Sequence, residues 1–147
     1  MILLLESFFV AIYSCAIFSI LKYFLNLKIN IILLIFITGF FKHFIGWISG
    51  LQHLYCASKN YENISLYRQR QRQGLSNAYD FIARFVSKII ESLGEGILFV
   101  GLFLIIRSLS LTHNNYLIVC IIGAFLHLLF EFIGMHKIFC KNGQNVL

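Results

Sequence analysis

Four long apolar stretches dominate this chain of 147 residues, and they constrain its fold more than any other feature. They cover about residues 2–21, 29–50, 89–106 and 115–135. A helix that crosses a bilayer needs about 20 predominantly apolar residues, because each residue adds about 1.5 Å along the helix axis. The sequence therefore predicts an all-α integral membrane protein, a four-helix bundle that forms a single domain over residues 1–147.

Composition points to the same class of protein. Hydrophobic residues make up 59% of the chain and charged residues 12%, whereas soluble domains are about 25% charged. The chain contains no proline, the residue that most often kinks or ends a helix. We therefore expect long helices that run without proline-induced breaks.

The distribution of lysine and arginine predicts the orientation in the membrane. One side would hold both termini and the central loop, about residues 57–88, and it carries eight basic residues: Lys59, Arg68, Arg70, Arg72, Arg84, Lys88, Lys137 and Lys141. The other side carries three: Lys22, Lys28 and Arg107. Because cytoplasmic loops are enriched in Lys and Arg, both termini are expected on the cytoplasmic side, or on the matrix side in a mitochondrion.

The central loop contains the most hydrophilic part of the chain. Arg68, Arg70 and Arg72 alternate with glutamines there. These arginines are candidates for binding anionic lipid headgroups, although a solvated positive loop has the same composition. No aromatic residues are interleaved with them, so nucleic acid is not an expected partner.

Residues 76–93 show helical spacing of apolar and polar residues. Such a segment is typical of an amphipathic helix that lies in the headgroup layer. Gly94-Glu95-Gly96 would then form a bend into the third span. The alternative is one long helix that continues through these glycines, and the sequence favours neither.

A stripe of glycine, histidine and alanine begins in the second stretch and continues past its end, at alternating steps of four and three: Gly39, His43, Gly46, Gly50, His53 and Ala57. In lipid, small residues at this spacing let a neighbouring helix approach closely. The fourth stretch has similar positions at Gly123 and Gly134. We therefore expect Gly39, Gly46, Gly50, Gly123 and Gly134 to mediate helix packing.

Four of the six acidic residues lie within or at the ends of the apolar stretches: Glu6, Glu91, Glu95 and Glu131. A carboxylate in lipid must be paired, protonated or turned toward the bundle interior. Counting along the helices places Glu95, His43 and His127 at similar depths. The sequence thus predicts one polar zone inside the bundle.

Four interpretations of this zone remain open. The first is a set of structural ion pairs, with Lys42 as counter-charge. The second is a path for protons or other ions. The candidate path residues are Glu6, Glu91, Glu95, His127 and Glu131.

The other two interpretations involve catalysis or a cofactor. A metal-dependent or acid–base membrane enzyme would use Glu95, His127 and Glu131. A haem would use His43 and His127 as axial ligands. No standard metal-binding spacing of His, Cys or Glu is present, so no metal site is predicted and the cofactor stays unknown.

The sequence best fits a small accessory subunit of a larger membrane complex, with lipids and other subunits as partners. It has no recognisable catalytic motif, so an enzyme is not the favoured interpretation. Residues with AT-rich codons are abundant, including 16 Phe, which favours a mitochondrial inner membrane of respiratory-chain type or a viral or host membrane. The alternative is a proton- or ion-conducting protein or an enzyme built on the polar zone.

Overall fold

Four long helices form the protein in the computed structural model, which describes residues 2–25, 29–51, 55 and 78–138. They are α1 (Ile2–Phe24), α2 (Ile31–Ile48), α5 (Ala78–Ser108) and α6 (Asn115–Phe132). The described part of the chain is helical apart from short turns and connections. The predicted all-α four-helix bundle is confirmed. Arg68, Arg70 and Arg72 lie outside the described residues, as do His53 and Ala57.

Asparagine and glycine set the ends of α2 and α6. The Asn30 side chain accepts a hydrogen bond from the backbone N–H of Ile32 at the start of α2. Asn114 does the same for Tyr116 at the start of α6. Two glycines with positive φ, Gly50 at 75° and Gly134 at 72°, follow the last turns of these helices. Glycine adopts this left-handed conformation without steric cost, which makes it a common residue just past a helix end.

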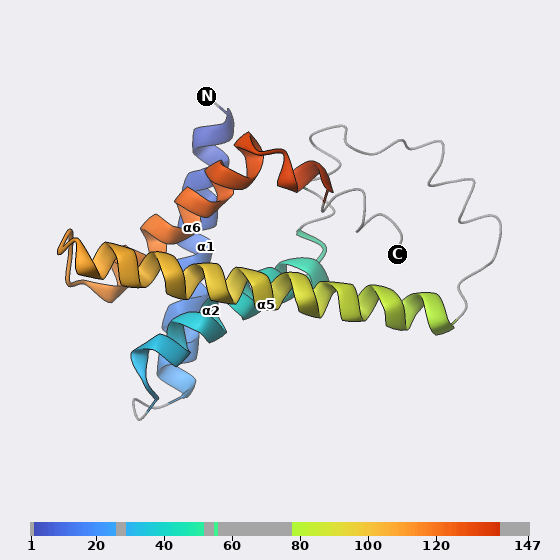
Figure 1. Ribbon diagram of the computed structural model, residues 1–147, viewed down its shortest axis with the longest axis horizontal. Helices are drawn as coiled ribbons and strands as arrows, with labels where there is room; N and C mark the ends of the chain where they lie inside the picture. Colours follow the sequence, from blue (N-terminus) through green and yellow to red (C-terminus); the bar gives the residue numbers. More distant parts are fainter. Residues whose placement is uncertain (1, 26–28, 52–54, 56–77, 139–147) are drawn as a thin grey trace.

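The helices are arranged as two pairs that cross each other (Figure 1). α2 packs along α5, and α1 packs along α6. The core lies where the pairs meet and is built of apolar side chains from all four helices: Phe18, Leu34, Ile35, Phe99, Phe103, Ile118, Val119, Ile122, Leu126 and Phe130. The first and fourth spans are therefore neighbours, although they are farthest apart in the sequence.

α5 is one continuous helix of 31 residues. It runs through Gly94, Glu95 and Gly96 without the bend that a separate interfacial helix would need. The predicted interfacial helix is therefore not a separate element, and residues 78–88 of the predicted central loop are the first turns of α5. Gly96 has a packing role instead, because a Cβ there would lie 2.9 Å from the carbonyl oxygen of Phe36 on α2.

The other glycines differ in role. A Cβ on Gly39 would lie 2.8 Å from the ring of Phe99, so this glycine brings α2 close to α5. Gly123 brings α6 close to Ser14 of α1 in the same way. No described atom lies within 4 Å of a Cβ on Gly46. Gly50 and Gly134 shape turns after α2 and α6 rather than contacts between helices.

Each of the four helices contains a stretch long and apolar enough to cross a membrane: Leu3–Phe24, Ile31–Ile48, Phe85–Ser108 and Asn115–Phe132. Many large apolar side chains on their outer faces are exposed, including Phe8, Phe9, Ile97 and Leu104. In water such a surface would be unfavourable, whereas acyl chains can cover it. These helices match the four spans expected from the sequence.

Candidate functional site: an ionisable network between α2 and α5

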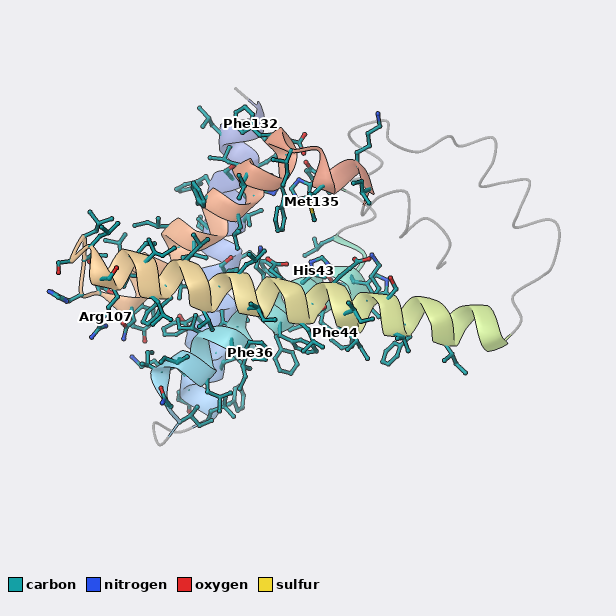
Figure 2. The ribbon with its side chains drawn as sticks, in the orientation of Figure 1. Phe36, His43, Phe44, Arg107, Phe132 and Met135 are labelled. Carbon is teal, nitrogen blue, oxygen red and sulfur yellow. The ribbon has the colours of Figure 1, made fainter. Side chains whose placement is uncertain are left out.

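Five ionisable side chains converge at the contact between α2 and α5. Lys42 and His43 are consecutive residues in the second half of α2. Lys88, Glu91 and Glu95 lie three and four residues apart on α5, so they occupy one face of that helix. We call this set the α2–α5 network. Figure 2 labels His43 and Phe44 of α2 on opposite sides of the α5 ribbon.

The side chains of the network form a chain of alternating bases and acids. Lys42 Nζ donates to Glu95 Oε1. His43 Nδ1 lies 2.7 Å from Glu95 Oε2, and His43 Nε2 lies 3.4 Å from Glu91 Oε2. Lys88 Nζ then donates to Glu91 Oε2 at 2.6 Å. The order Lys42, Glu95, His43, Glu91, Lys88 therefore places a basic group on each side of both carboxylates.

The network is largely shielded from solvent and lipid. Glu95 is 4% exposed and Lys88 is 2% exposed. A charge in such a place is costly unless an opposite charge and hydrogen bonds compensate it. Each carboxylate here has two basic neighbours. The pairing explains how two acids and two lysines are tolerated within an apolar bundle.

The position of His43 implies one shared proton. A neutral imidazole has one N–H donor and one acceptor nitrogen, and an ionised carboxylate only accepts hydrogen bonds. Both ring nitrogens of His43 face carboxylate oxygens. Either both nitrogens carry hydrogen, or one of Glu91 and Glu95 is protonated. This pairing therefore needs one more proton on His43, Glu91 or Glu95 than a neutral imidazole between two ionised carboxylates would hold.

A second polar group lies between α1 and the C-terminal end of α6, and we call it the α1–α6 cluster. The Tyr55 hydroxyl donates to Glu131 Oε2 at 2.6 Å, and His136 Nδ1 lies 3.0 Å from the same oxygen. His127 Nε2 lies 3.9 Å from Glu6 Oε2. The rings of His127 and His136 have centroids 4.8 Å apart. The cluster thus contains two carboxylates, two imidazoles and one phenol.

The two polar groups are close neighbours. The Tyr13 hydroxyl of α1 donates to the backbone carbonyl of Lys42 at 3.4 Å, which links α1 to the α2–α5 network. His136 is near enough to Lys42 and Glu95 for their charges to act on it. Burial lowers the pKa of His136 below its ordinary value of 6.5, and the Glu131 carboxylate opposes that shift. His136 follows the last span, beside Met135, which Figure 2 labels near the end of α6.

The structure distributes the predicted site residues over these two groups. Glu91 and Glu95 lie in the α2–α5 network with His43. Glu6, His127 and Glu131 lie in the α1–α6 cluster. The predicted single zone is therefore two adjacent zones, because α2 pairs with α5 and α1 pairs with α6.

Neither the haem interpretation nor the metal-enzyme interpretation gains a complete site among the described residues. His43 and His127 belong to different polar groups, and both nitrogens of His43 face carboxylates. Within residues 2–25, 29–51, 55 and 78–138, no group of three or more His, Cys, Asp or Glu is arranged to hold a metal ion. Haem ligation by His43 and His127 stays a prediction.

Sequence reasoning did not assign three members of these groups to the site. Lys88 was counted as a loop charge, although it lies one turn before Glu91 and on its face of α5. That spacing was the available signal. Tyr55 and His136 contact Glu131 from segments outside the four spans, and nothing in their local sequence indicated this contact.

Fold and site together define a small polytopic membrane protein with four candidate spans and a buried ionisable interior. No protein-family model, curated protein or solved structure matches this chain at a significant level. Any function must therefore be argued from its own residues.

Proposed function

We propose that this chain is a membrane protein whose buried network takes up and passes on protons. The observation that carries the proposal is the His43 imidazole, which bridges the carboxylates of Glu95 and Glu91 through its two ring nitrogens. An imidazole titrates closer to neutral pH than any other side chain. It can receive a proton on one nitrogen and release one from the other.

The surroundings of His43 support a relay. Ionisable residues inside membrane spans are rare, and chains of Asp, Glu and His mark proton paths in pumps and transporters. The α1–α6 cluster adds Glu131, His136 and Tyr55 on the side toward the end of α6. A proton that leaves the α2–α5 network thus has titratable groups nearby in the direction of the membrane surface.

Proton flux into liposomes tests this proposal. The full chain is reconstituted in vesicles that contain a pH-sensitive dye, and a potassium diffusion potential drives proton entry. We expect flux above the lipid leak, abolished in Glu95→Gln and His43→Gln. Arg107→Gln is the matched control, because Arg107 lies at the exposed far end of α5. Leak-level flux in the wild type would refute a conducting role.

A second candidate is an accessory subunit of a larger membrane complex, of the respiratory-chain or viral membrane type. The matched charges of the network favour this second candidate. Lysine–glutamate pairs of this kind would be present even if their sole role were to join α2 to α5. Exposed apolar faces would contact lipids and partner subunits. Glu95→Gln and Glu131→Gln separate the two candidates. Weakened co-purification with partners and unchanged flux would favour the subunit.

The orientation proposed here keeps both termini on the cytoplasmic or matrix side. Lys88 is buried within a candidate span, so it no longer counts as a loop charge. Seven basic residues then remain on that side against three on the other. Asn63-Ile64-Ser65 is a glycosylation sequon in the central loop. A glycan on Asn63 in a secretory-pathway host would reverse this orientation.

A further inference from the structure

Two cysteines from opposite ends of the sequence meet between α1 and α6. Cys15 lies on α1, which packs along α6, and Cys120 lies on α6. Cys15 Sγ also lies 3.8 Å from the carbonyl oxygen of Tyr116, one helical turn before Cys120. Both residues are reduced and half-buried. Their separation of more than a hundred residues hides this pairing in the sequence.

The backbones of α1 and α6 approach closely beside this pair. Gly123 lies against Ser14, the residue before Cys15, and a Cβ on it would be 3.3 Å from the carbonyl oxygen of Val10. A disulfide needs Cα atoms about 4.4–6.8 Å apart. Close backbone approach is the condition that two rigid helices usually fail to meet. The small residue at position 123 lets α1 and α6 approach closely three residues after Cys120.

We propose that Cys15 and Cys120 form a redox-modifiable dithiol site that small-molecule disulfides convert into a covalent link between α1 and α6. One cysteine thiolate attacks the small disulfide, forms a mixed disulfide and releases one small thiol. The second cysteine then attacks the protein sulfur of the mixed disulfide and releases the other small thiol. The cysteines lose two electrons and two protons, and the two released thiols carry them away.

The pair lies inside two candidate spans, so a membrane-permeant disulfide is needed to reach it. Cys120 lies five residues after the start of α6, and Cys15 lies nine before the end of α1, so the two are about 8 Å and about 14 Å from those helix ends. In the orientation proposed above, these ends lie on the non-cytoplasmic side, where secretory compartments are oxidising. This site is independent of the proposed proton network, which uses neither cysteine.

The experiment uses the full chain in lipid vesicles with Cys56 and Cys140 replaced by Ser, so that two of its four cysteines remain. The probe is dithiodipyridine, a membrane-permeant aromatic disulfide. We expect two thiopyridone molecules released per chain, loss of both maleimide-reactive thiols and no pyridyl group left on the protein. The unsubstituted chain, mapped by proteolysis and mass spectrometry, should show the α1 peptide joined to the α6 peptide.

The control moves one thiol around α1 at nearly the same depth. Cys15→Ser with Ala16→Cys places it about 100° away on the helix, at an exposed position. In this variant each thiol that reacts should keep its pyridyl group as a mixed disulfide, and no α1 peptide should be joined to an α6 peptide. Equal closure in the control would overturn the proposal. So would a Cys15–Cys120 pair that yields mixed or intermolecular disulfides in place of the internal link.

Discussion

Nδ1 of His43 on α2 lies 2.7 Å from the Oε2 oxygen of Glu95 on α5, and Glu95 is almost completely buried. The other carboxylate oxygen of Glu95 accepts a hydrogen bond from Lys42. One acid therefore joins two consecutive residues of the neighbouring helix. This arrangement makes Glu95 the centre of the contact between α2 and α5.

Removing the positive partner of Glu95 should destabilise the protein strongly. Lys42→Met leaves the buried carboxylate with His43 as its remaining partner in the network. Breaking a buried ion pair costs about 3–5 kcal/mol, whereas replacing both partners with apolar residues is often nearly neutral. We expect Lys42→Met to lower the free energy of unfolding in mixed micelles by about 3 kcal/mol and Lys42→Met/Glu95→Met to recover most of it. An equal loss in the double variant would show that pairing is not the cause.

Gly96 and Gly101 offer a matched test of helix packing on α5. A Cβ at Gly96 would meet the backbone carbonyl of Phe36, whereas no described atom lies within 4 Å of one at Gly101. Gly96→Ala should cost about 1–3 kcal/mol, because backbone cannot move aside as a side chain can. Gly101→Ala should be neutral or stabilising by up to about 1 kcal/mol, since alanine is the better helix former. Thermal unfolding in detergent measures both, and similar values would contradict this packing.

A larger residue at position 123 should be tolerated when position 14 carries a smaller one. Gly123→Ala places a methyl group against the Ser14 side chain, including its Cβ at 2.9 Å. The single variant should separate α1 from α6 and lower the melting temperature. Adding Ser14→Gly removes the obstructing atoms and should restore most of the loss. Failure of the second change to rescue the first would mean that the two residues are not in contact.

His136 should make stability depend on pH. Burial lowers its pKa below 6.5, with Lys42 adding to the shift and the carboxylates of Glu131 and Glu95 opposing it. The unfolded chain then binds the proton more readily than the folded one, so this contribution is complete above about pH 6.5 and is lost as the pH falls toward the folded pKa. His136→Asn should flatten the unfolding profile in that window.

The exposed His113, in the connection before α6, provides the control. His113→Asn should leave the pH dependence of the free energy of unfolding as in the wild type, because this side chain is exposed in the folded protein. Two results would argue against a buried neutral His136. The free energy of unfolding of the wild type could be independent of pH below about pH 6.5, or its pH dependence could be unaltered by His136→Asn.

The sequence predicted the spans well because lipid imposes length and apolarity on each helix separately. Glu95 stood out for the same reason, as a carboxylate within an apolar stretch. Which helices pair was not predictable, since it depends on contacts such as Gly39 with Phe99 and Gly96 with Phe36. The division of the polar residues into two groups follows from that pairing, and so do the partners of Glu131.

The α5 helix shows the limit of local rules. Glycines often mark helix kinks. A bend at Gly94-Glu95-Gly96 was therefore one of the two alternatives that the sequence allowed. Packing of Gly96 on α2 and the bonds of Glu95 to Lys42 and His43 hold this segment against α2. Tertiary contacts thus decide between the two alternatives that the periodicity allowed.

The central claim is that a proton moves among His43, Glu91 and Glu95. Infrared difference spectroscopy of the protein in lipid, recorded between acidic and alkaline pH, tests it most directly, because a protonated carboxyl group has its own C=O absorption. We predict such a band in the wild type and in Arg107→Gln, and its loss or shift in Glu95→Gln and Glu91→Gln. Carboxylates that stay ionised across the whole range would contradict the claim and leave the network a fixed ion-pair contact between α2 and α5.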